Sequence, residues 1–86
     1  MAGLDQLEVI RERAAAAKLE MFSQALNKTG PLAEQAIRAC INIYDRSIED
    51  LKPFLNERFF GDSAQILIST LEAERRAFNR ALTETR

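Results

Sequence analysis

The sequence of 86 residues contains no histidine and no tryptophan, one cysteine, three glycines and two prolines. Histidine is the most common general base and the most common ligand of transition metals, so its absence argues against most enzymes and metal centres. A single cysteine cannot form an intramolecular disulfide, which argues against a disulfide-stapled scaffold. No apolar run approaches the ~20 residues that a helix needs to cross a bilayer.

Other signatures of catalysis are also missing. The sequence has no Gly-rich phosphate loop, no cofactor fingerprint and no serine or cysteine that could pair with a histidine. The carboxylates Asp45, Glu49 and Asp50 lie on one predicted helix, without the looped arrangement and turn glycine that calcium sites use. We therefore expect a protein that is not an enzyme and that holds no metal and no cofactor.

The charges of the chain are nearly balanced, with 12 basic and 13 acidic side chains and a formal net charge of −1. Apolar residues make up 47% of the chain and charged residues 29%, which is typical of a globular protein. A molecule with this balance lacks the overall positive charge that favours binding to nucleic acid or to an anionic membrane. Because the N-terminal stretch "MAGLDQLEVIRER" reaches charged residues early, we expect no signal peptide and a cytoplasmic location.

Glycine and proline are scarce and, apart from Gly3, occur at three places, "TGP" at 29–31, Pro53 and "GDS" at 61–63. Between these breaks apolar residues recur every three or four positions, and no period-2 alternation indicates a strand. One domain, 1–86, is predicted, with helices over 5–28, 31–52 and 63–85 and a short helical segment over 53–60. Asp5 and Asp62 have the side chain and position of N-cap residues for the first and last helices.

The lengths of these helices determine how they pack. A helix of ~20 residues is ~30 Å long, about the width of a globule formed by a chain of this size. The helices must therefore lie side by side, and the short connections predict an all-α, antiparallel up-down bundle of three long helices with the Phe-rich segment at one end. A second apolar stripe on the first helix, which includes Ala15, Leu19, Phe22 and Leu26, indicates that this helix has two neighbours. The apolar faces exceed what one three-helix core requires, so we expect a homodimer.

The candidate interaction residues cluster after the proline. Phe54, Phe59 and Phe60 occur within seven residues, with Leu55 beside them. Two interpretations remain open, in which these side chains either close the end of the bundle or form an exposed patch for a partner. Tyr44 is a further candidate, either as a core residue with its hydroxyl at the rim or as an interface hot spot. The lone cysteine shares its helix face, where we expect it to be a buried apolar residue.

The sequence therefore predicts a small protein-binding module, a regulator, inhibitor or assembly adaptor, that acts by stoichiometric association with another protein. A first alternative is a nucleic-acid-binding regulator that uses Arg75, Arg76 and Arg80 on the basic last helix. Glu72 and Glu74 are interleaved with these arginines, which favours a solvated, ion-paired face. A second alternative is a structural subunit of a larger assembly, of viral or plasmid origin. Neither alternative involves a membrane.

Overall fold

The computed structural model describes residues 2–25 and 30–84 of the chain, and over these residues it contains helices and no strands. The helices pack against one another, which confirms the predicted all-α class and the mutual packing of three long helices. In chain order they are α1 (Ala2–Ala25), α2 (Pro31–Leu51), the 3₁₀ helix η1 (Lys52–Asn56) and α3 (Gly61–Glu84).

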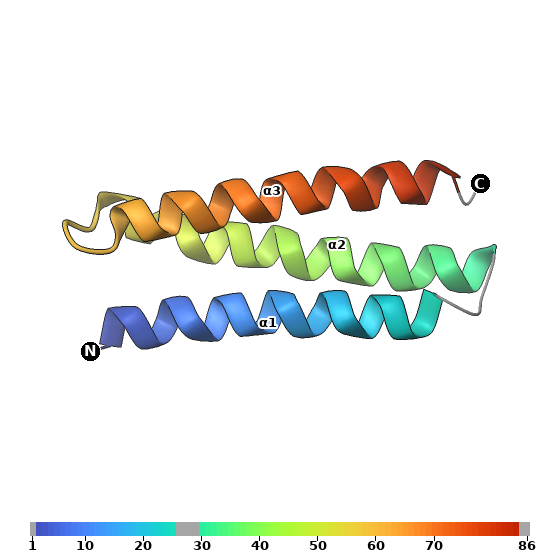
Figure 1. Ribbon diagram of the computed structural model, residues 1–86, viewed down its shortest axis with the longest axis horizontal. Helices are drawn as coiled ribbons and strands as arrows, with labels where there is room; N and C mark the ends of the chain where they lie inside the picture. The colour runs from blue at the N-terminus through green and yellow to red at the C-terminus, as the bar shows by residue number, and fades with distance from the viewer. Residues whose placement is uncertain (1, 26–29, 85–86) are drawn as a thin grey trace.

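The three α-helices form an elongated body with extents of 45 × 19 × 14 Å. Figure 1 shows that the chain passes along α1 in one direction, returns along α2 and then follows α3 in the first direction again. Helix α2 lies between the other two and packs extensively against both, whereas α1 and α3 contact each other very little. The bundle is consequently least closed along the side where α1 and α3 face each other.

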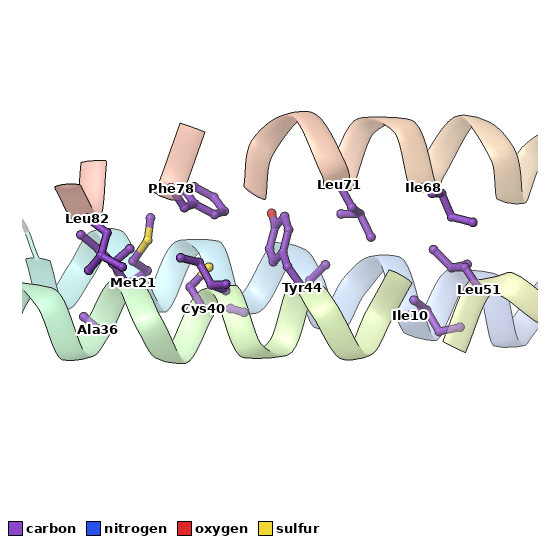
Figure 2. Close-up of a cluster of buried hydrophobic side chains, with 14 of the residues drawn as sticks. Ile10, Met21, Ala36, Cys40, Tyr44, Leu51, Ile68, Leu71, Phe78 and Leu82 are labelled. Carbon is purple, nitrogen blue, oxygen red and sulfur yellow. The ribbon is translucent and has the colours of Figure 1, made fainter. Parts of the chain in front are cut away.

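The core is built from the residues that helical spacing predicts. On α1 the buried side chains recur at intervals of three and four residues, at Leu7, Ile10, Ala14, Ala17 and Met21. The middle helix contributes buried side chains on both of its flanks, at Ala33, Ala36, Ile37, Cys40, Ile41, Tyr44, Ser47 and Leu51. Figure 2 shows the Tyr44 side chain rising from α2 toward α3, between Phe78 and Leu71. The core therefore runs along the whole length of the bundle.

Two helices begin earlier than the sequence predicted. Helix α1 begins at Ala2, so Asp5 lies in its first turn and is not the N-cap, and α3 begins at Gly61, so Asp62 also lies in a first turn. Both cap predictions are therefore wrong, although an acidic side chain in a first turn still interacts favourably with the helix dipole. The predicted ends at Lys28 and Thr85, and Leu26 of the second stripe, lie outside the described residues.

The connection between α2 and α3 is less helical than the predicted segment 53–60. Only Lys52–Asn56 is helical, as η1, and Glu57 is extended with φ −77° and ψ 135°. Pro53 is accommodated because it stands in the first turn of η1, where a missing N–H leaves no hydrogen bond unmade. The weaker hydrogen-bond geometry of 3₁₀ helices limits them to a few residues, so the segment turns sharply before α3.

Candidate functional site

The phenylalanine cluster divides into buried and exposed members. We call Phe54, Leu55, Phe59 and Phe60 the elbow patch, because they lie on η1 and on the turn that precedes α3. Phe54 and Phe60 are half-buried and pack against the core. Leu55 is 39% exposed and Phe59 is 80% exposed. The two interpretations left open by the sequence therefore apply to different residues of the same patch.

An apolar hollow of about 400 Å³ lies beside the elbow patch, between α1 and the end of α2. Its apolar lining includes Val9, which is 62% exposed, and Phe54. Two carboxylates, Asp5 and Asp50, stand at the same hollow, and Asp50 accepts a hydrogen bond from Arg13 at 2.8 Å. This end of the molecule thus combines exposed apolar surface with acidic groups.

A second apolar surface, which the sequence analysis did not single out as a site, runs between α1 and α3. We call this surface the seam. One end of it is a hollow of about 430 Å³ lined by Leu7, Glu8, Arg11, Ser63, Ile66, Leu67 and Thr70. The other end is a hollow of about 300 Å³ lined by Met21, Phe22, Ala25, Ile37, Ala77, Phe78 and Ala81. The second stripe on α1 was its signal in the sequence, since Phe22 of that stripe lines the second hollow and remains 48% exposed.

One polar contact crosses the middle of the seam. The Lys18 ammonium on α1 lies 2.6 Å from Oε2 of Glu74 on α3. The hydroxyl of Tyr44 on α2 donates to the other carboxylate oxygen, Oε1, at 3.3 Å. The three helices therefore meet at a single carboxylate, with apolar surface on both sides of it.

Tyr44 and Cys40 lie in the core beneath this contact, with 1% and 2% of their surfaces exposed. The structure thus removes Tyr44 from the residues that could contact a partner directly, because its ring is packed between helices. Burial, assisted by the charge of Glu74, raises the pKa of the Tyr44 hydroxyl and raises the pKa of the Cys40 thiol to about 11. A thiol with this pKa is protonated at neutral pH and is a poor nucleophile.

The three arginines considered for nucleic acid have different surroundings. Arg75 forms an ion pair with Asp45 of α2, and this hydrogen-bonded partner raises the pKa of the guanidinium. Arg76 and Arg80 are exposed on α3. One of the three cations is therefore already held by a carboxylate of the neighbouring helix.

Residues 2–25 and 30–84 contain no group of three or more acidic, cysteine or histidine side chains that could hold a metal ion. In the same part of the chain, none of the helices has the length and apolar character that crossing a membrane requires. Comparisons of the chain with protein-family models, with curated proteins and with solved structures found no match. The elbow patch with its neighbouring hollow and the seam are therefore the two candidate functional surfaces.

Proposed function

We propose that this protein is a non-enzymatic protein-binding module that acts stoichiometrically, as a regulator, inhibitor or assembly adaptor, and that it works as a homodimer. The observation that carries the proposal is the exposure of Phe59, 80% of whose surface faces solvent on the turn before α3. Full burial of a phenylalanine side chain is worth about 1.5–3 kcal/mol relative to exposure, so a partner that covers it gains a substantial anchor. Aromatic anchors of this kind are typical of interface hot spots.

The turn that carries Phe59 is held in place on both sides. The Glu57 N–H donates to the Phe54 carbonyl at 3.0 Å, and the Gly61 N–H donates to the Glu57 carbonyl at 3.0 Å. Phe54 and Phe60 pack against the core on either side of it. A side chain on a turn fixed in this way loses little conformational entropy when a partner binds, which favours affinity.

The neighbouring hollow suggests the chemistry of the partner. Val9 and Phe54 supply apolar lining and Asp5 supplies negative charge, while the charge of Asp50 is offset by its ion pair with Arg13. A segment with an apolar side chain next to a lysine or arginine matches both features, because opposite charges steer association and fix orientation. We therefore expect a partner with a basic, amphipathic segment.

The test of binding compares three purified proteins in affinity capture from native-host lysate, followed by titration of each captured protein against each purified variant. The proteins are the wild type, Phe59→Asp and the control Leu32→Asp, which changes a side chain that is 57% exposed at the start of α2. We expect a partner whose affinity falls about 100-fold or more with Phe59→Asp, the size of a hot-spot loss, and stays unchanged with Leu32→Asp. Equal binding by all three proteins contradicts the proposal.

The homodimer is tested separately by sedimentation equilibrium at micromolar concentration. A species of twice the chain mass of 9.7 kDa is expected, and a single species of one chain mass contradicts this part of the proposal.

Nucleic-acid binding through Arg75, Arg76 and Arg80 stays a prediction. If the protein does not change the gel mobility of DNA or RNA at low salt, this prediction is wrong. A role as a structural subunit of a larger assembly also stays a prediction.

A further inference from the structure

We infer that the seam is the dimer surface, and that a second copy of this chain covers it with its helices antiparallel to those of the first. This inference rests on the homodimer of the proposed function and adds its surface and its geometry. Helices α1 and α3 both pack on α2 but scarcely on each other. The side of the body along which α1 and α3 contact each other so little is the seam, with a hollow toward each end.

Each end of the seam has an exposed apolar side chain beside a hollow. Phe22, which is 48% exposed, lines the hollow at one end. The hollow at the opposite end is the larger one, and its lining includes Ile66, which is 68% exposed. The seam thus has one exposed apolar side chain and one hollow at each end, and the hollow at the Ile66 end is the larger.

A two-fold axis through the middle of the seam brings these unlike ends together twice. It brings Phe22 of each copy to the end of the other copy where the larger hollow lies, between Leu7 on α1 and Ile66 on α3. Isologous contacts are self-complementary in this way, since residue i meets residue j and j meets i. A partner with a different sequence would need to reproduce the same spacing independently, so the pattern favours a second copy as occupant.

The charges of the seam are compatible with a second copy. Glu8 lies 2.6 Å from Arg11, and Lys18 lies 2.6 Å from Glu74, so the four charged side chains that line the seam form two neutral pairs. The whole chain carries only −1, so two copies repel each other weakly. Because the charges on this surface are already paired with each other, a second copy can cover it without burying an unpaired charge.

The length of the seam is sufficient for a stable dimer. Helices α1 and α3 have 24 residues each. Such helices are about 36 Å long and about 10 Å wide, so two of them side by side offer on the order of 700 Å². Stable interfaces bury ~800 Å² per partner. The seam therefore provides an area of the required size.

The direction of the helices follows from the same axis. Figure 1 shows α1 and α3 running in the same direction. A two-fold axis perpendicular to them makes the corresponding helices of the second copy run the opposite way, which is also the favourable arrangement for neighbouring helix dipoles. The dimer then has a central four-helix bundle of α1 and α3 from both copies, with α2 of each copy on the outside.

Sedimentation equilibrium of charge-introducing variants tests the surface. We expect Phe22→Glu and Ile66→Glu to weaken dimerisation by about 100-fold or more, with unchanged helical circular dichroism. The matched control is Leu32→Glu, a residue 57% exposed and absent from the lining of the seam, which should dimerise like the wild type. Dimers that persist in both seam variants overturn the seam assignment and leave the homodimer intact. A wild type that is monomeric at every concentration overturns both the seam assignment and the homodimer. The same holds if a helix of another protein is found to fill the seam of such a monomer.

Disulfide crosslinking tests the orientation. A chain with Phe22→Cys is mixed with a chain with Ile66→Cys that carries a tag to mark its mass, and the mixture is oxidised. The antiparallel arrangement predicts the mixed disulfide as the main crosslinked product, while buried Cys40 stays unreacted. A product dominated by two Phe22→Cys chains joined to each other overturns the orientation.

Discussion

Tyr44 and Phe78 pack edge to face, with their ring centroids 5.1 Å apart and their planes at 80°. The first ring belongs to α2 and the second to α3, so this contact joins the two helices near the middle of the bundle (Figure 2). Edge-to-face pairs contribute about 0.5–1.5 kcal/mol beyond the burial of their area. Phe78, which is 7% exposed, also contributes to the lining of the smaller hollow of the seam.

The first prediction compares the same substitution at two phenylalanines. Phe78→Ala should lower the free energy of unfolding by about 3–5 kcal/mol, because it leaves a cavity and removes the ring contact with Tyr44. Phe59→Ala should change it by less than about 0.5 kcal/mol, because an exposed side chain contributes little to stability. Urea denaturation of both variants gives the two values. A loss at Phe59 as large as that at Phe78 would mean that the turn before α3 is covered in the free protein.

The buried positions were predictable because each long helix is amphipathic over many turns. Residues such as Leu7, Ile10 and Ala14 repeat at helical spacing, and nothing in the fold competes with that signal. The same signal could not distinguish which apolar faces meet within one chain. Leu19 and Phe22 fit the pattern of a buried stripe, yet they remain exposed because α3 packs on α2 and not on them.

The elbow patch shows a second limit of sequence reasoning. Three phenylalanines close together predicted either burial or exposure, but the choice depends on backbone geometry that composition does not encode. The change from α-helix to η1 at Lys52 and the extended Glu57 direct Phe54 and Phe60 inward and Phe59 outward. The sequence therefore located the candidate site but could not assign the individual residues.

The second prediction concerns Gly61, the first residue of α3. A Cβ atom at this position would lie 2.9 Å from the carbonyl oxygen of Leu55, a backbone atom that cannot rotate away. Alanine is a better helix former than glycine by up to about 1 kcal/mol, but the clash opposes this gain. Overpacking typically costs about 1–3 kcal/mol, so Gly61→Ala should be destabilising by roughly 1 kcal/mol net.

Gly61→Ala should also displace the elbow patch and weaken binding of a partner that Phe59 anchors. Thermal denaturation and a binding titration measure the two effects. The matched control is Gln65→Ala, at an exposed position one turn further along α3 and outside the lining of the seam, which should leave both unchanged. A stabilised Gly61→Ala protein would show that the connection can shift without strain.

The third prediction is a loss of stability at alkaline pH. The pKa of Cys40 is raised from 9.0 to about 11 by burial and by the charge of Glu74. Between these two values the unfolded chain releases the thiol proton while the folded chain retains it, so the free energy of unfolding falls as pH rises. A shift of this size corresponds to a loss on the order of 2 kcal/mol.

The contribution of Cys40 can be isolated by difference. Tyr44, whose pKa is also raised by burial, adds to the alkaline loss in the wild type. Cys40→Ala should therefore show a shallower decline of stability between pH 9 and 11 than the wild type, measured by urea denaturation at intervals of pH. Parallel curves for the two proteins would indicate that solvent reaches the thiol.

The last prediction concerns Ser47, a polar side chain with 0% exposure in the middle of the core. Its hydroxyl donates to the carbonyl of Ile43 at 2.8 Å and accepts from the Arg13 guanidinium at 3.1 Å. The first bond goes to a carbonyl one turn back, an arrangement that is neutral to slightly destabilising within a helix. The second is not the only bond of that guanidinium, because Arg13 also donates to Asp50 at 2.8 Å.

Ser47→Ala should consequently change the free energy of unfolding by less than about 1 kcal/mol, because alanine favours the helix and Arg13 keeps its carboxylate partner. Ser47→Leu should be destabilising by about 1–3 kcal/mol or more, because no space is open around a fully buried serine. Urea denaturation of the two variants separates the role of the hydroxyl from the role of its size. If Ser47→Ala is as destabilising as Ser47→Leu, the hydroxyl is required to hold Arg13 against α2, and the size of the side chain is secondary.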